Sequence, residues 1–376
     1  MLIIGTNVLN FKGNYQKKGF FMFSANDYRQ LSNSNIKISP LTLGTMTFGD
    51  QNSKVEAYEQ LDFALDFGIN SIDIAELYPV PPKADTYTKT ESILGDWLQT
   101  QDREKIIISS KVAGPRRKLD WIRGGPSSLN EENIVNAVDA SLKRLKTEYI
   151  DIYYLHWPER NVPMFGQYKF DPDGDLEDGK EILWVSIYDQ LTTLSKLIDS
   201  GKIRTIALSN EQPWGLMEFI RIARQHKLPV ISALQNNYNL LNRTAEFGIS
   251  EILYREQLSF LAYSPLAFGY LTGKYIENEK AEGRVNLFPG YAKRFDKPGV
   301  KYAVKQYAQL AKKYHLSLTE MSLAFVRSQW FMTSTILGAT SLHQLKENMK
   351  SYSIELSDDI LNEIEQIHLS VMNPAP

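Results

Sequence analysis

Apolar residues recur along the chain with two periods in turn, and this alternation predicts strands and helices one after the other. In segment 71–75, Ile72 and Ile74 alternate with other residues, a period of two that is typical of a strand. Between residues 134 and 145, apolar side chains instead recur every three or four positions, as on one face of a helix. Patterns of the first kind predict eight strands, at residues 41–43, around Ile72, and at 106–108, 150–154, 203–208, 230–234, 258–262 and 334–337.

Helical patterns fall between these strands. Ser53 and Glu56 form the capping-box sequence of a helix that runs to Phe67. The chain holds eight strand–helix units, and its composition does not change along them as it would at the boundary of a second domain. The pattern therefore predicts one α/β domain, a (β/α)8 TIM barrel with extra C-terminal helices. A doubly wound sheet is the alternative, and it is weakened because no Gly-x-Gly-x-x-Gly motif follows the first strand. Further helices are predicted at residues 91–98, 130–145, 187–198, 214–225, 243–254, 300–314, 319–328 and from Ser341 onward.

The N-terminal region departs from this alternation. Tyr28–Leu31 and Ile36–Ile38 predict a short β-hairpin that precedes the barrel. Residues 1–27 hold no sustained period, and a second methionine stands at Met22. We expect residues 1–27 to be a disordered extension, or the true start to lie at Met22, and the barrel domain to cover residues 28–376.

Composition narrows the classes of function. The 42 basic and 44 acidic residues are well mixed, so the sequence gives no reason to expect a nucleic acid or an anionic membrane as partner. Cysteine is absent, which excludes disulfides, thiolate nucleophiles and cysteine–zinc sites. No run reaches the roughly 18 apolar residues of a membrane-spanning helix. We expect a cytoplasmic protein that is a monomer rather than an oligomer and acts on a small molecule.

The ends of the predicted strands carry the candidate chemistry. In a (β/α)8 barrel the active site is built at the C-terminal ends of the strands, so side chains just past each strand converge on one face. Each such residue, taken alone, also has an explanation without a function. A carboxylate can cap the end of a strand, a lysine can be a solvent-exposed side chain, and a histidine can be part of the core. The residues in question are Thr45, Met46, Asp73, Tyr78, Lys111, His156, Ser209, Asn210, Gln235, Ser264 and Gly338.

Four of these residues together fit the reduction of a carbonyl group. An ammonium such as that of Lys111 stabilises a nearby phenolate, and we expect it to lower the pKa of Tyr78 from its ordinary value of about 10. Asp73 would hold Lys111 in place, and His156 would orient a carbonyl oxygen by a hydrogen bond. Tyr78 is then the general acid that protonates the alkoxide as it forms. The hydride must come from a cofactor, because no side chain donates one.

Polar groups at later strand ends suit a nicotinamide cofactor. Ser209, Asn210 and Gln235 offer hydroxyl and amide groups that can hold a carboxamide, and Tyr263 offers a flat face for stacking. Segment 264–274 is rich in small residues and is a candidate for phosphate contacts.

Two further features bear on the phosphates. The helix that begins near Ser341 could receive a phosphate on its N-terminal amides, although Ser341 and Gln344 also fit an ordinary capping box. Lys274 and Arg284 lie in the loop after the seventh strand and are the candidate partners of a 2′-phosphate.

At this point the chain resembles the aldo-keto reductase superfamily, and more narrowly its bacterial Tas-type NADP(H)-dependent reductases, which are related to potassium-channel β subunits. The resemblance covers about residues 28–376. It rests on the motifs GTMTFG (44–49), AELYPVPP (75–82), SKV (110–112), HWP (156–158), LSN (208–210), YSPL (263–266) and LGAT (337–340).

The resemblance implies residue roles. It implies that Asp73, Tyr78, Lys111 and His156 are a catalytic tetrad with Tyr78 as general acid. It also implies an NADP(H) site that includes Ser209, Asn210, Gln235, Ser264, Leu266, Gly269, Lys274, Arg284, Gly338, Thr340, Gln344, Glu347 and Asn348. To these we add Thr45, Met46, Asp73, Tyr263 and Pro265 as expected cofactor contacts.

The substrate is expected to be an aldehyde or ketone with an apolar or aromatic part. Two long loops, Pro79–Lys89 and Glu159–Val185, follow Tyr78 and His156, and we expect the aromatic-rich second loop to be an ordered lid. Phe48, Trp121 and Trp157 are expected to add apolar wall to the pocket.

Two other functions are open to the same sequence. An NADP(H)-sensing module of the channel-β type, with only residual reductase activity, would carry the same cofactor motifs. NADPH consumption with aldehydes would separate it from a reductase. A metal-dependent barrel hydrolase is disfavoured because only His156, of the five histidines, follows a predicted strand, and we expect no metal.

Overall fold

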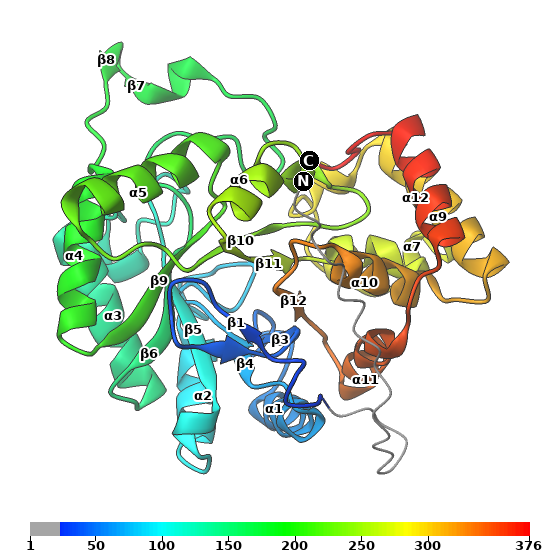
Figure 1. Ribbon diagram of the computed structural model, residues 1–376, viewed down its shortest axis with the longest axis horizontal. Helices are drawn as coiled ribbons and strands as arrows, with labels where there is room; N and C mark the ends of the chain where they lie inside the picture. Colours follow the sequence, from blue (N-terminus) through cyan, green and yellow to red (C-terminus); the bar gives the residue numbers. More distant parts are fainter. Residues whose placement is uncertain (1–22) are drawn as a thin grey trace, which may run out of the picture.

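In a computed structural model, which describes residues 23–376, the strands close into a barrel surrounded by helices (Figure 1). Eight parallel strands pair in the closed order β10-β11-β12-β3-β4-β5-β6-β9, which confirms the predicted (β/α)8 barrel. β12 pairs with β3, so the last strand of the barrel in chain order lies beside the first and closes the sheet. The strands are β3 (Leu41–Gly44), β4 (Ser71–Asp73), β5 (Ile107–Val112), β6 (Ile150–Leu155), β9 (Ile203–Ser209), β10 (Ala233–Asn237), β11 (Ser259–Tyr263) and β12 (Ser334–Leu337).

Helices alternate with these strands and cover the outside of the barrel. The predicted capping box is present, because the Ser53 hydroxyl accepts from Glu56 N–H and the Glu56 carboxylate accepts from Ser53 N–H. No helix of residues 23–376 is long and apolar enough to cross a membrane. The helices are α1 (Lys54–Phe67), α2 (Lys89–Leu98), α3 (Glu131–Leu145), α4 (Ile187–Asp199), α5 (Pro213–His226), α6 (Ile249–Arg255), α7 (Lys274–Glu277), α8 (Arg284–Leu287), α9 (Pro298–Lys313), α10 (Leu318–Ser328), α11 (Leu342–Lys350) and α12 (Asp358–Ser370).

Two predicted elements are wrong in their bounds. The strand predicted at 230–234 begins only at Ala233, although Ser232 N–H already donates to Ile206 O of β9 at 2.8 Å. The helix predicted at 243–254 is a short 3-10 turn followed by α6. Gly248 separates the two with φ 82°, a left-handed conformation that interrupts a helix.

The predicted N-terminal hairpin closes one end of the barrel. Its strands are β1 (Arg29–Gln30) and β2 (Lys37–Ile38), which pair antiparallel. The hairpin side chains Leu31, Ile36 and Ile38 are buried together with residues of the barrel strands, among them Ile107 and Ile152. The hairpin therefore caps the interior of the barrel with apolar side chains.

The packed domain begins earlier than predicted. Phe23 is buried, and its ring lies edge-on to Phe67 at 5.2 Å and to Tyr352 at 4.7 Å. The predicted boundary at Tyr28 is therefore wrong, because an aromatic side chain ahead of it joins the core. The predictions made for residues 1–22 lie outside the described residues.

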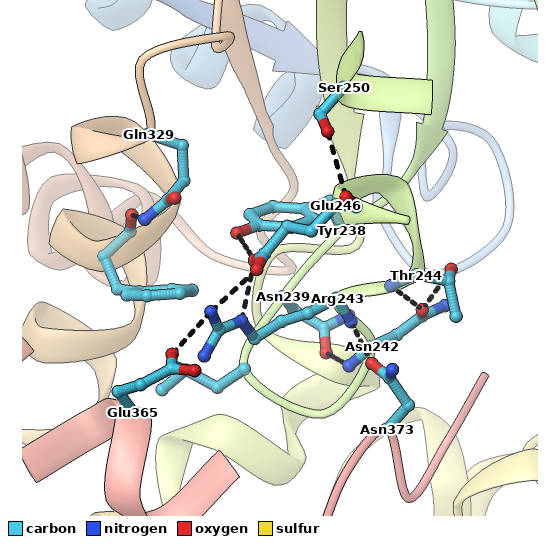
Figure 2. Close-up of polar contacts among 12 residues, drawn as sticks. Tyr238, Asn239, Asn242, Arg243, Thr244, Glu246, Ser250, Gln329, Glu365 and Asn373 are labelled. Carbon is cyan, nitrogen blue, oxygen red and sulfur yellow. Dashed lines mark hydrogen bonds and ion pairs between the residues drawn. The ribbon is translucent and has the colours of Figure 1, made fainter. Parts of the chain in front are cut away.

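The C-terminal end of the chain packs against the loop that follows β10 (Figure 2). Asn373 Oδ1 accepts a hydrogen bond from Arg243 N–H at 2.6 Å. The Arg243 guanidinium pairs with Glu246 at 2.6 Å and with Glu365 of α12 at 2.8 Å. Tyr238, whose hydroxyl donates to Glu246 at 2.6 Å, joins this network to the loop. The loop at the C-terminal end of β10 is therefore fixed by residues from the end of the chain.

Candidate active site

A buried ion pair lies at the C-terminal ends of β4 and β5. Lys111 Nζ is 2.7 Å from Asp73 Oδ2 and donates a second hydrogen bond of 2.7 Å to Ile74 O. Asp73 Oδ1 accepts from Ser109 Oγ at 3.1 Å and from Gln235 Nε2 at 2.8 Å. Both charges are therefore compensated by partners, as their burial requires.

Tyr78 lies next to this pair and is itself buried. Lys111 Nζ is 5.0 Å from the centroid of the Tyr78 ring, and the ring of His156 is 5.9 Å away. Burial raises the pKa of Tyr78 well above 10, and the charge of Asp73 raises it further. The expected lowering of this pKa is therefore wrong for this structure, because the raising effect of burial dominates. The phenol holds its proton, as a general acid must.

His156 follows β6 and presents a neutral ring. Burial lowers its pKa well below 6.5, and the positive charges of Lys111 and Arg117 lower it further. Its buried Nδ1 has no hydrogen-bond partner within residues 23–376. A neutral imidazole beside Tyr78 can give or take one hydrogen bond with a carbonyl oxygen.

A cavity of about 750 Å³ opens at this end of the barrel. Asp73, Tyr78 and His156 line it, while Lys111 is fully buried behind them. All of the predicted cofactor contacts also line it. These are Thr45, Met46, Asp73, Ser209, Asn210, Gln235, Tyr263, Ser264, Pro265, Leu266, Gly269, Lys274, Arg284, Gly338, Thr340, Gln344, Glu347 and Asn348.

The amide and hydroxyl groups on one wall are held in fixed orientations. Asn210 Nδ2 donates to His156 O at 2.8 Å, and Asn210 Oδ1 accepts from the Tyr263 hydroxyl at 2.6 Å. Ser209 Oγ donates to Gln235 O at 2.9 Å. All three groups predicted to hold a carboxamide line the cavity, and the side-chain amide of Gln235 is engaged with Asp73.

Lys274 and Arg284 line the cavity, and neither has a carboxylate oxygen within 4.0 Å among residues 23–376. Lys274 Nζ donates to a backbone oxygen, Glu282 O, at 2.9 Å. The Arg284 guanidinium lies 5.0 Å from the Phe268 ring, and its buried Nε has no hydrogen-bond partner within residues 23–376. Burial lowers the pKa of both side chains. Half-buried cations at a cavity suit a phosphate group, so these residues fit the phosphorylated dinucleotide expected here.

At the start of α11, only half of the capping box expected for Ser341 and Gln344 is present. Ser341 Oγ accepts from Gln344 N–H at 3.2 Å, so Ser341 caps the helix. Gln344 Oε1, however, accepts from Thr340 N–H at 3.0 Å rather than from Ser341 N–H, so the reciprocal half of the box is absent. The side-chain oxygen of Gln344 therefore holds Thr340 at the cavity wall.

The three predicted wall aromatics do not line this cavity, and their prediction is wrong. Phe48 and Trp157 are fully buried, and Trp157 Nε1 donates to Pro115 O at 2.9 Å. Trp121 packs edge-on against Tyr87 at 5.2 Å. All three follow barrel strands but pack into the surrounding protein. The aromatic wall is made instead by Tyr263, Phe268, Tyr291 and Phe165.

The loop after His156 covers the site only in part. Phe165 lines the cavity, but Tyr168 and Phe170 are 63% and 56% exposed. The loop continues into a hairpin of β7 (Leu176–Glu177) and β8 (Lys180–Glu181) that projects from the barrel at the top of the view in Figure 1. The expected lid is therefore wrong for the distal part of the loop.

Sequence reasoning missed two arginines and a tyrosine of the cavity. Arg117 follows β5, and Tyr291 and Arg294 precede α9. None stands at a strand end or in a periodic segment, so no pattern marked them. Only the unusual density of arginine and lysine in 115–118 and 293–297 could have drawn attention to them.

Comparison with known proteins agrees with this geometry. Residues 40–369 match the Aldo/keto reductase family. The chain is 43% identical over 350 residues to Protein tas of Escherichia coli strain K12, which covers 93% of this chain and 99% of that protein. It is 38% identical over 283 residues to an aldo-keto reductase of Babesia bovis, which covers 72% of this chain and 98% of that protein. It is 25% identical over 346 residues to L-glyceraldehyde 3-phosphate reductase of Escherichia coli strain K12, covering 90% of this chain and 91% of that protein. The chain belongs to the aldo/keto reductase family and is an oxidoreductase of the Tas type.

Proposed function

We propose that this aldo/keto reductase transfers a hydride from NADPH to an aldehyde or ketone, with Tyr78 as the general acid. The observation that carries the proposal is the position of the Tyr78 phenol. It is buried and protonated, it lies beside a neutral His156 and the Asp73–Lys111 pair, and it faces a cavity lined by every expected cofactor contact.

Each residue has a role in moving the proton. Tyr78 donates its phenolic proton to the carbonyl oxygen as negative charge develops there. Lys111, whose ammonium is 5.0 Å from the ring centroid, stabilises the phenolate that remains. Asp73 holds Lys111 charged, and the His156 ring orients the carbonyl oxygen. The bound cofactor supplies the hydride, and the product is an alcohol.

The rest of the cavity is suited to hold the cofactor. Ser209 and Asn210 would orient the carboxamide, and Tyr263, tied to Asn210, would support the ring. Members of the family generally use NAD(P)H. We propose NADPH for this chain because Lys274 and Arg284 place two positive charges at the cavity, and neither has a carboxylate oxygen within 4.0 Å among residues 23–376.

The test is NADPH oxidation by the purified chain over a panel of aldehydes and ketones, followed by the absorbance of the reduced nicotinamide. Carbonyl-dependent oxidation supports the proposal. Tight NADPH binding with no oxidation by any compound of the panel would favour the nucleotide-sensing module. Absence of NADPH binding would overturn both.

A further inference from the structure

The cavity has three positively charged side chains beyond the two assigned to the cofactor. Besides Lys274 and Arg284, it is lined by Arg117, Lys293 and Arg294. Its acidic lining residues are Asp73 and Glu347, and Asp73 is already paired with Lys111. Of the two acidic lining residues, only Glu347 is therefore left to balance the three additional cations.

Arg117 is held next to the catalytic residues by aromatic rings. Its guanidinium lies 4.1 Å from the Phe165 ring and 5.3 Å from the Trp157 ring. The Trp157 ring is in turn 5.1 Å from the His156 ring. Stacking on two rings fixes a planar guanidinium without neutralising it, so its donors stay available to a bound group.

Arg294 lines the same cavity as Arg117, from the loop before α9. Its guanidinium lies 5.0 Å from the rings of Phe268 and Phe295. The segment that carries Phe165 contacts it, because a Cβ placed on Gly166 would lie 2.9 Å from Arg294 Cβ. Burial lowers the pKa of Arg117, Tyr291 and Tyr263 act in the opposite direction, and the positive charge of Arg294 adds to the lowering.

Neither arginine has a carboxylate to neutralise it. Within residues 23–376, the arginines with a carboxylate oxygen within 4.0 Å are Arg103, Arg123, Arg144, Arg160, Arg204, Arg221, Arg224, Arg243 and Arg255. Arg117 and Arg294 are not among them. Two neighbouring guanidinium groups repel each other, and a bound anion that accepts from both would remove this repulsion.

We propose that the substrate of this enzyme is an anionic carbonyl compound, whose carboxylate or phosphate binds to Arg117 and Arg294 while its aldehyde or ketone faces Tyr78 and His156. The inference rests on the proposed function, because the reaction is the same hydride and proton transfer to the carbonyl group. It replaces the expectation of a purely apolar or aromatic substrate with one that carries a negative charge. The aromatic wall of Phe165, Phe268 and Tyr291 then packs against the part between the two groups.

The test compares two substrates that differ in charge and little in shape, para-carboxybenzaldehyde and its methyl ester. Wild-type enzyme should show a kcat/KM for the acid at least ~10-fold above that for the ester. Arg117→Met should lower kcat/KM for the acid by roughly 10- to 100-fold, mainly through KM, and leave the ester within about threefold. The dissociation constant of NADPH should not change.

Two further variants keep the result interpretable. Arg294→Met changes a different loop and should show the same charge-specific loss, so misfolding of one variant cannot account for both. Arg116→Met is the matched control, because the adjacent Arg116 is exposed, stacks on Trp184 at 4.2 Å and does not line the cavity. It should behave as wild type.

Three outcomes would overturn the inference. Equal kcat/KM for acid and ester in the wild type would do so, as would an equal loss of both in Arg117→Met. A weaker NADPH affinity in Arg117→Met, without charge-specific loss, would assign Arg117 to the cofactor.

If wild type reduces neither aldehyde, the proposed function fails, and binding of terephthalate to the NADPH-loaded protein tests the anion site separately. No binding, or binding unaffected by Arg117→Met, would reject it.

Discussion

The side-chain amide of Gln235 donates a hydrogen bond of 2.8 Å to Asp73 Oδ1 across the width of the barrel. β10 and β4, which carry the two residues, are diametrically opposite in the closed order of eight strands. The carboxylate that positions Lys111 is thus held from both sides. The wall predicted to bind a carboxamide and the proton-transfer residues are joined through one contact.

The first prediction concerns this contact. Gln235→Leu removes a hydrogen bond to a buried carboxylate, so we expect the free energy of unfolding to fall by about 1–3 kcal/mol. Denaturant unfolding measures it. Gln51→Leu is the control, because Gln51 also lines the cavity but bonds only weakly, to Val80 O at 3.4 Å. Equal stability of the two variants would show that the cross-barrel bond contributes nothing.

Tyr78→Phe keeps the ring and removes the proposed acid. We expect turnover to fall by ~10²-fold or more because the alkoxide loses its proton donor. NADPH should still bind and quench the protein fluorescence. Tyr153→Phe is a suitable control, since the buried Tyr153 hydroxyl has no hydrogen-bond partner within residues 23–376. Normal turnover of Tyr78→Phe would remove Tyr78 from the mechanism.

Lys111→Met leaves the carboxylate of Asp73 buried without its cation. Breaking a buried pair from one side typically costs about 3–5 kcal/mol, so this variant should unfold at a much lower denaturant concentration. The double variant Asp73→Asn/Lys111→Met leaves no uncompensated charge and should be more stable than Lys111→Met alone, while remaining inactive. A double variant less stable than the single one would contradict the role of charge pairing.

The neutral His156 predicts a pH dependence of stability. Its folded pKa lies well below 6.5, so the unfolded chain binds a proton near pH 6.5 that the folded chain does not. Stability therefore falls as the pH drops below about 6.5, with His156 contributing up to about 1.4 kcal/mol per pH unit until its folded pKa is reached.

His156→Gln should reduce this slope between about pH 7 and pH 5, measured by denaturant unfolding. His368 is also buried and its pKa is also lowered by burial, so part of the wild-type slope should remain. A His156→Gln slope equal to wild type would mean that His156 is protonated in the folded state.

The last prediction concerns cofactor preference. The enzyme should bind NADPH more tightly than NADH, and Lys274→Met/Arg284→Leu should erase most of the difference. Each charge-assisted contact to the 2′-phosphate is worth roughly 1.5–3 kcal/mol. Dissociation constants of both cofactors measure it. Lys280→Met, an exposed lysine of the same loop, should keep the wild-type ratio. If the double variant also keeps it, the 2′-phosphate is held elsewhere, and α11 near Gln344 is the next place to test.

The sequence was informative where function is tied to regular structure. Asp73, Lys111 and His156 stand at or near strand ends, and the topology of the barrel brings such positions together. The same rule placed Ser209 and Asn210 at the cavity.

The features that could not be predicted from the sequence depend on packing between distant segments. Arg117 reaches the cavity because it stacks on Phe165 from another loop, and no local pattern contains that contact. Trp157 follows a strand as the active residues do, yet its ring turns into the protein. The pKa of Tyr78 was mispredicted for the same reason, because burial outweighs the nearby ammonium.

The pairing of β12 with β3 sets the order in which the protein can be completed during synthesis. Leu41 emerges from the ribosome before every other strand of the barrel, and its partner Thr335 emerges after all of them. Until then the sheet is open, and β3 presents backbone groups that other chains can pair with. A chain cut short by a premature stop codon before Ser334 would keep two free sheet edges. Such a truncated product should be a substrate for chaperones and proteases rather than a weak enzyme.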